Sequence, residues 1–345
     1  MDWSRLIAQA RSAGVLGRIA YQLASQTDIA VPPEAKVHLQ SALRVSAAQR
    51  KEVEREVRHV TRALAVSDTA VVLLKGAAYA VADLPAAAGR IFSDIDLLVP
   101  KRDLPAVEAL LALAGWTTTH HDAYDQRYYR EWMHELPPLE HSIRRTVLDV
   151  HHTILPETAR LRPDAALLLS AAEPLPQQPR LRVLAPPDMV LHSMTHLFMN
   201  EEMSHALRDL ADLDTLVRHF EALPGFWPRL LERAARLDLG RPLYYGLTHL
   251  VRCFATPVPP DTLAASRRHA PPWPLRAMME WIWRRALRTP HPSAGLRGQS
   301  LALFALYVRG HWLRMPPLLL IRHLSIKAWR RWKEGQPDPD LGPRR

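Results

Sequence analysis

The chain has 345 residues, of which 48% are hydrophobic and 23% charged, so it is not a disordered chain and has length for about two domains. Its single cysteine, Cys253, excludes an intramolecular disulfide and a cysteine metal motif, and favours a cytoplasmic protein. The formal net charge of +10 indicates an anionic partner: nucleotide phosphates, nucleic acid or a membrane surface.

The N-terminal segment is predicted to be helical. A first amphipathic helix should extend to about Ser25, and a second should begin at Pro33, since proline is favoured at the first helical position. Along that second helix Val53, Val57 and Val60 recur at helical spacing. They predict one apolar stripe that faces the core.

A strand, a tight turn and a helix are predicted next. Residues 69–75 form a short apolar run of strand length that ends at Gly76, and residues 77–84 have helix-forming composition. Glycine allows a tight turn and a close approach of backbone N–H groups to phosphate, and a helix N-terminus favours anions. Lys75 could reach the same phosphate as a point charge, so this turn is a candidate phosphate site.

Residues 91–99 alternate polar and apolar side chains at period two and predict a half-buried strand. On such a strand Asp94 and Asp96 share one face. Two carboxylates this close repel each other unless a cation neutralises them, and hard oxygen ligands favour Mg²⁺. Acidic pairs are also common on exposed strands, so the signal for a site is their combination with the preceding Lys-Gly turn.

A third acid is expected on a neighbouring strand, because metal-dependent phosphoryl transfer uses carboxylates from more than one segment. The candidate is Asp149, in a strand predicted over residues 146–153, where Asp149 and His151 share a face. Between the two acidic strands, Asp103 should begin a helix that ends before Gly115.

The last part of the chain is predicted to be helical to about Trp332. It follows a stretch from 155 to 187 in which seven prolines surround one short helical piece, and we place a domain boundary near residue 186. The predicted organisation is an N-terminal helical segment (1–66), a catalytic domain (67–186), a C-terminal helical domain (187–335) and a tail (336–345).

Three motifs together resemble the family of uncharacterised bacterial nucleotidyltransferases, which is similar in turn to the DNA polymerase β superfamily. They are Leu-Leu-Lys-Gly-Ala-Ala-Tyr at 73–79, Arg-Ile-Phe-Ser-Asp-Ile-Asp at 90–96 and Leu-Asp-Val-His at 148–151. The likeness covers about residues 70–320. It implies an α+β fold: a nucleotidyltransferase-like mixed β-sheet flanked by helices, with N-terminal helices and a C-terminal helical domain.

The resemblance also implies a metal centre and a nucleotide site. Two Mg²⁺ ions are expected on Asp94, Asp96 and Asp149. An NTP, with ATP as the first choice, is expected to contact Lys75, Gly76, Arg90, Ser93 and His151. The implied activity is transfer of a nucleoside monophosphate to a hydroxyl or phosphate of an acceptor, for which a sugar or glycan, a protein and tRNA stay open.

Other polar residues have simpler interpretations. His192 and His196 lie one helical turn apart but lack the glutamate of a zinc-protease motif, so we expect core histidines. Arg208, Asp209 and Asp212 share a helix face, which predicts a structural ion pair, with support of the active-site cleft as the alternative.

Two segments leave alternatives open. Residues 120–129 are predicted to be a surface loop, with a mobile cover over the cleft as the alternative, and His134 is a further candidate by resemblance alone. The basic segment 301–332 has no uncharged run long enough to span a bilayer, so we expect it to pack against the catalytic domain. The alternative is peripheral contact of this basic C-terminal helix with anionic lipid.

The alternative hypothesis is a catalytically silent nucleotide-binding or membrane-surface scaffold with the same fold. The presence of all three acids argues against it. If the carboxylates serve only the metals, Asp96→Asn should remove transfer and leave the fold intact or slightly stabilised. The reason is that a neutral amide relieves repulsion within the cluster.

Overall fold

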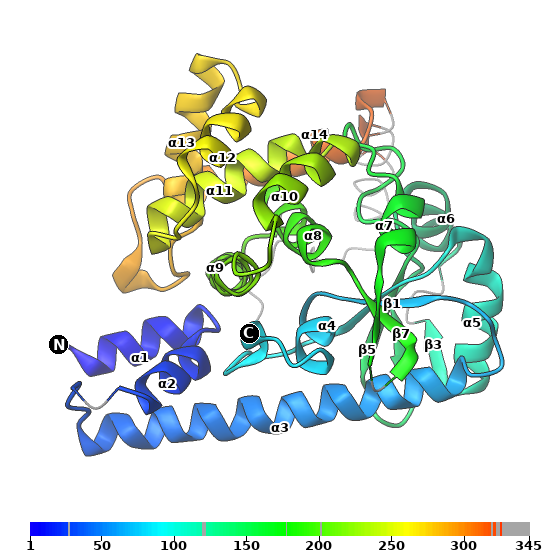
Figure 1. Cartoon of the computed structure of the whole chain (residues 1–345), viewed down its shortest axis with the longest axis horizontal. Coiled ribbons are helices and arrows are strands. Elements are labelled where there is room, and N and C mark those ends of the chain that lie inside the picture. The colour runs from blue at the N-terminus through cyan, green and yellow to red at the C-terminus, as the bar shows by residue number, and fades with distance from the viewer. Residues whose placement is uncertain are drawn as a thin grey trace.

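The computed structural model describes residues 1–26, 28–118, 122–176, 178–200, 202–318, 320, 321 and 325. A seven-stranded mixed sheet occupies one side of the molecule, and a group of helices stands beside it (Figure 1). One long helix runs underneath both parts. The α+β class, with N-terminal and C-terminal helices around a mixed sheet, is therefore confirmed.

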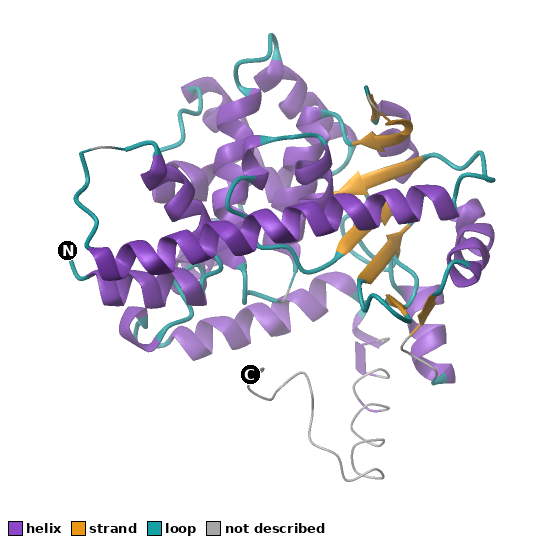
Figure 2. Ribbon diagram, turned by 90° about the horizontal axis from the view of Figure 1, so that it is seen from below, coloured by secondary structure: helices purple, strands orange, loops and turns teal. Residues whose placement is uncertain are grey.

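The N-terminal part consists of α1 (Trp3–Ser12), α2 (Leu16–Ala24) and α3 (Pro33–Ala63). The single helix predicted up to Ser25 is thus two helices, because Gly14 adopts a left-handed φ of +69° and ends α1. The long helix α3 crosses the molecule from the N-terminal helices to the sheet (Figure 2). Its predicted stripe of Val53, Val57 and Val60 is buried in the core, as expected.

The sheet has the strand order β3-β4-β5-β2-β1-β7-β6. Its strands are β1 (Val71–Leu74), β2 (Ile95–Leu98), β3 (Trp116–Thr118), β4 (Leu139–His141), β5 (Val147–His151), β6 (Glu173–Leu175) and β7 (Gln178–Val183). At its centre β2 runs parallel to β5 and antiparallel to β1. This register pairs Asp96 with Asp149 across one neighbour and with Leu74, the residue before Lys75, across the other.

The prediction that the strand carrying Asp96 is half-buried is wrong. All residues of β2 are buried, and Asp96 is 2% exposed. The physical reason is its central position: strands flank β2 on both sides, and helix α8 (Pro186–Met199) contributes to the pocket over the face that carries Asp96. The alternation of polar and apolar residues along β2 therefore does not mark an exposed face, because the face that carries Asp96 is covered.

Several elements differ from the sequence-based expectation. The proline-rich stretch contains β6 and β7. Pro174 is tolerated in β6 because this is an edge strand, where a missing N–H costs no ladder bond. The segment predicted as a loop over residues 124–129 is helix α6 (Ala123–Trp132). Tyr124 and Tyr128 both contact Trp132 edge-on at helical spacing. Residues 120 and 121 of that prediction lie outside the described residues.

The remaining helices are α4 (Lys75–Val81), α5 (Leu104–Leu113), α7 (Ala165–Ala171), α9 (Ala206–Phe220), α10 (Phe226–Arg236), α11 (Gly240–Phe254), α12 (Pro260–Ser266), α13 (Trp273–Ala286) and α14 (Gln299–Arg314). One apolar core extends from Val53 through the sheet to Leu306. The boundary near residue 186 marks a change from mixed structure to helices, and the domain limits stay a prediction. Within the described residues, no helix has the length and apolar character that a membrane span requires.

Candidate metal centre and pocket

Three carboxylates converge beside the central strands. Asp94 precedes β2, Asp96 lies within it, and Asp149 faces Asp96 on the parallel neighbour β5. One oxygen from each carboxylate lies within 4.8 Å of the other two. This spacing suits shared metal ions about 4 Å apart. The acids thus meet as their strands predict, and their role as metal ligands stays a prediction.

Asp96 is held by two cationic neighbours. Lys75 Nζ donates a hydrogen bond of 2.7 Å to Asp96 Oδ1, and His151 Nε2 lies 3.0 Å from the same oxygen. Burial alone would raise the pKa of Asp96, but the Lys75 ammonium and the His151 ring together hold the pKa well below its usual range. Asp96 is therefore an ionised carboxylate, and the pKa of Lys75 is raised by the carboxylates around it in spite of burial.

Asp149 has the opposite environment. Its Oδ1 atom is buried and has no hydrogen-bond donor among the described residues. Burial, followed by the charges of Asp96 and Glu135, raises the pKa of Asp149 to about 7. An orphaned buried carboxylate oxygen is costly unless a cation approaches it, and a set of carboxylate oxygens is the donor type that Mg²⁺ prefers. The residues present therefore fit a magnesium centre.

A fourth acid, Glu135, was not identified from the sequence. Its Oε2 lies 3.1 Å from His151 Nδ1, and the rings of His134 and His151 lie 5.1 Å apart between their centroids. The sequence signal is the His-Glu pair at 134–135, of which the resemblance marks only the histidine as a candidate. Only the pairing of Glu135 with His151 at the end of β5 shows that the glutamate belongs to the site.

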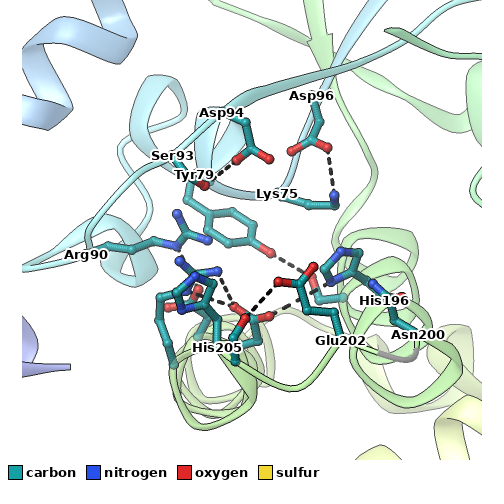
Figure 3. A pocket seen from close by; sticks show the side chains of 16 residues that line it. Lys75, Tyr79, Arg90, Ser93, Asp94, Asp96, His196, Asn200, Glu202 and His205 are labelled. Atoms are coloured by element: carbon teal, nitrogen blue, oxygen red, sulfur yellow. Dashed lines mark hydrogen bonds and ion pairs between the residues drawn. The ribbon is translucent and has the colours of Figure 1, made fainter. Parts of the chain in front are cut away.

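A pocket of about 320 Å³ opens beside Asp94 and Asp96 (Figure 3). One wall comes from α4 and the segment before β2, including Lys75, Ser93 and Asp94. The opposite wall comes from α8, α9 and their connection, and carries His196 and His205. The volume lies within the range of about 300–1,000 Å³ that is usual for ligand pockets. The predicted C-terminal helices thus complete the site.

The predicted Lys-Gly turn has a different local structure from the one expected. The left-handed backbone lies at Lys75, with φ +46°, whereas Gly76 is already helical. A Cβ atom at Gly76 would collide with the guanidinium of Arg90. Glycine is therefore required here because Arg90 lies across it, and its small size serves packing against Arg90 more than the turn itself. Both residues line the pocket, together with Ser93, whose hydroxyl donates to Asp94 at 2.6 Å.

Arg90 is tied to a distant helix. Its Nε donates to Asp212 Oδ2 of α9 at 2.8 Å, and Arg18 of α2 pairs with the other oxygen of Asp212. Burial alone would lower the pKa of Arg90, but the carboxylates of Asp212 and Asp209 raise it. This buried cluster joins the N-terminal helices, the catalytic sheet and α9. Contact of Arg90 with a nucleotide stays a prediction.

The helix-face residues behave partly as expected. An ion pair does form at Arg208, but its partner is the adjacent Asp209, whereas Asp212 binds the two arginines from other elements. His192 is 4% exposed and lies in the core, as expected. His196, one turn later, lines the pocket instead.

A model of the family described as "Uncharacterised nucleotidyltransferase" matches residues 1–255. The match includes the N-terminal helices, the sheet with its three acids, and the helices through α11. No curated protein and no solved structure matches the chain.

Proposed function

The chain belongs to the family of uncharacterised nucleotidyltransferases, and we propose that it transfers a nucleoside monophosphate from an NTP, with ATP as the first donor to test. The observation that carries this proposal is the meeting of Asp94, Asp96 and Asp149 next to a pocket that Lys75, Asp94 and Asp96 line. The acceptor group would be a hydroxyl or a phosphate.

The charge of the pocket supports a metal-dependent reaction. Five carboxylates but only three lysine and arginine side chains line it. A triphosphate would be repelled by this surplus of negative charge unless cations are held with it. Two Mg²⁺ ions would reverse the local charge, help to activate the attacking oxygen and stabilise the leaving oxygen. The acids of this chain would hold them.

Each wall of the pocket has a proposed task. On the catalytic wall, Lys75 and Ser93 would contact the nucleotide phosphates. Asp149, which lies behind this wall on the strand beside Asp96, would help to accept the proton of the acceptor oxygen. The raised pKa of Asp149 suits this exchange. The acceptor would approach from the α8–α9 wall, which bears His196 and His205. A sugar or glycan, a protein and tRNA are the acceptors to compare, and a cytoplasmic location is proposed from the single cysteine.

The direct experiment is to incubate the protein with each labelled NTP, Mg²⁺ and a panel of sugars, proteins and tRNA. Transfer of label to one acceptor class, lost when EDTA removes the metal, would support the enzyme. Binding of NTP without transfer to any acceptor would instead favour the silent nucleotide-binding scaffold. Absence of both binding and transfer would overturn the proposed function.

Lys75→Ala is expected to weaken NTP binding more than it slows the bound complex. A charge-assisted phosphate contact is worth about 1.5–3 kcal/mol, so affinity should fall about tenfold or more. The measurement is calorimetric titration with ATP and Mg²⁺, paired with single-turnover rates. Lys101→Ala is the matched control, because Lys101 is exposed and pairs with Glu157 outside the pocket. Equal ATP affinity of the wild type and Lys75→Ala would remove Lys75 from the nucleotide site.

A membrane-surface role has its own support in helix α14. The helix buries Ala302, Leu306 and Gly310, and its opposite side is apolar as well. The outward residues recur at helical spacing and are 45–62% exposed: Leu301, Phe304, Val308 and Trp312. Trp312 contacts the guanidinium of Arg160, which lies 4.6 Å from its ring centroid, whereas Leu301, Phe304 and Val308 form an exposed apolar stripe.

The surroundings of this stripe favour an anionic lipid surface. Residues 256–318 contain nine arginines and only two acidic residues, so a second copy of the chain would bring two basic surfaces together. We infer that the enzyme contacts anionic membrane through α14, in addition to its reaction. Within the basic segment predicted for this contact, 301–332, residues 319, 322–324 and 326–332 lie outside the described residues.

Phe304→Ser should weaken binding to vesicles that contain phosphatidylserine by about tenfold or more, because a buried aromatic side chain contributes about 1.5–3 kcal/mol. Co-sedimentation with vesicles measures the effect. Ile143→Ser is the control, since Ile143 is 84% exposed at a site remote in sequence. Binding that is equal in the two variants, or a concentration-dependent dimer lost in Phe304→Ser, would contradict lipid contact.

A further inference from the structure

One ion pair and one hydrogen bond link Glu135 to the metal centre through one histidine ring. Glu135 Oε2 lies 3.1 Å from His151 Nδ1, and His151 Nε2 lies 3.0 Å from Asp96 Oδ1. The His151 side chain is 6% exposed, so water does not compete freely for either nitrogen. A carboxylate can only accept, so Nε2 donates to Asp96, while Nδ1 faces the negative charge of Glu135. The ring is thus fixed at both ends.

The backbone places Glu135 for this contact. Residues 134–136 run antiparallel to the end of β5: Leu136 N donates to Val150 O, and His152 N donates to His134 O, each at 2.9 Å. Glu135 and His151 form the bridge between these two bonds. The glutamate is therefore held on an ordered segment that pairs with the strand carrying Asp149.

The consequence for Asp96 is directional. Lys75 and His151 both contact Oδ1. The other oxygen, Oδ2, has no hydrogen bond to any described residue, so it is the atom that a cation could use. Rotation of the carboxylate would exchange the two oxygens. Lys75 and His151 both bind Oδ1 and so oppose that rotation. His151 can oppose it only while the orientation of its own ring is fixed.

We propose that Glu135 is a positioning residue that acts through His151 to hold Asp96 in the orientation that binds metal. This inference rests on the proposed function, because it assigns Glu135 a task in the metal centre of that same reaction. Groups that orient a metal ligand typically change metal affinity by about 10–100-fold when they are removed. Glu135 itself touches no reacting atom.

The test is binding of Mn²⁺, a paramagnetic substitute for Mg²⁺, to the full chain, measured by the electron paramagnetic resonance signal of free Mn²⁺. Glu135→Ala should weaken binding about tenfold or more. Glu135→Asp keeps the charge but shortens the side chain, so it should also weaken binding. Glu135→Gln keeps the length and an accepting oxygen, so it should restore most of the affinity. Glu131→Gln, on the exposed side of α6, is the control.

The outcomes separate this inference from the proposed function. If the wild type binds no Mn²⁺, the metal centre itself fails, and the task of Glu135 fails with it. If the wild type binds Mn²⁺ and folded Glu135→Asp and Glu135→Ala bind it equally well, the inference alone is overturned. If Glu135→Ala does not fold, the other two variants still test the inference, which requires weaker Mn²⁺ binding by Glu135→Asp than by Glu135→Gln.

A different metal arrangement would also overturn the inference. Ligand atoms of His134, Glu135 and His151 lie within 4.8 Å of one another and could hold an ion of their own. Tight Zn²⁺ binding that is lost in His134→Ala would make His151 Nδ1 a metal ligand and not the partner of Glu135. Under our proposal, His134→Ala leaves Zn²⁺ and Mn²⁺ affinities close to those of the wild type.

Discussion

Asp149→Asn is expected to abolish nucleotidyl transfer and, at pH 8 without metal, to stabilise the fold. The variant loses a metal-binding charge, so transfer should fall by about a thousandfold or more, as for other groups that stabilise charge in the transition state. The wild type, in contrast, keeps a buried carboxylate oxygen without a donor, next to the charge of Asp96. A neutral amide at this position relieves that repulsion, which should raise the free energy of unfolding by about 1–2 kcal/mol.

The same variant should change how stability depends on pH. Burial and Asp96 raise the pKa of Asp149 to about 7, above the value of about 3.9 expected in the unfolded chain. The folded state then binds the proton more tightly, so this stabilisation is fully present below about pH 4 and is lost as pH rises through 7. The contribution of Asp149 should amount to about 2–4 kcal/mol across that window.

Urea unfolding in EDTA between pH 4 and pH 9 measures both effects. The wild type should lose stability relative to Asp149→Asn as pH rises, and Mg²⁺ with NTP should stabilise the wild type more than the variant. If the unfolding free energies of the two proteins changed with pH in parallel, Asp149 would not be the group whose pKa is raised. Near wild-type transfer by the variant would remove it from the active site.

Asp96→Asn is expected to abolish transfer as well, but to destabilise the fold. This differs from the sequence-based expectation of an intact or slightly stabilised fold. In the structure Asp96 is the common partner of Lys75 and His151, so the amide leaves a buried ammonium and a buried imidazole without their counter-charge. Breaking a buried ion pair costs about 3–5 kcal/mol, and the neighbouring Asp94 should reduce the loss to about 2–3 kcal/mol.

Thermal and urea unfolding of Asp96→Asn without metal, together with label transfer, test this prediction. Asp94→Asn is the matched control, because its carboxylate accepts from the hydroxyl of Ser93 and forms no ion pair with a described residue. We expect Asp94→Asn to be inactive with nearly unchanged stability. An Asp96→Asn protein as stable as the wild type would mean that the Lys75 contact contributes little, and active Asp96→Asn would contradict the proposed function.

The three acids therefore look alike in the sequence and differ in the structure. Strand alternation predicted that Asp94 and Asp96 share a face, and the same rule selected Asp149, because side-chain direction along a strand is a local property. Protonation is not local. Asp96 is ionised because Lys75 and His151 face it, whereas Asp149 lies beside it without a donor.

The sequence by itself determined the features that depend on neighbouring residues. The apolar stripe of α3, the strand before Lys75 and the acidic pair follow from spacing within about a dozen positions, and the resemblance adds three short motifs. These features were sufficient to predict the α+β fold and to select acids that converge. The sequence also predicted the helix that ends before Gly115, because caps and turns are local signals.

Only the tertiary structure decided which distant residues meet. Arg18 and Asp212 are 194 positions apart, and no local pattern links them, yet their contact with Arg90 joins three parts of the chain at the pocket. Glu135 enters the site through pairing with His151 at the end of β5. The central strand is buried because β1, β5 and α4 pack against it, and burial by other elements cannot be read from the alternation of the strand. Charge and burial depend on what packs against a residue, and packing is fixed by the whole chain.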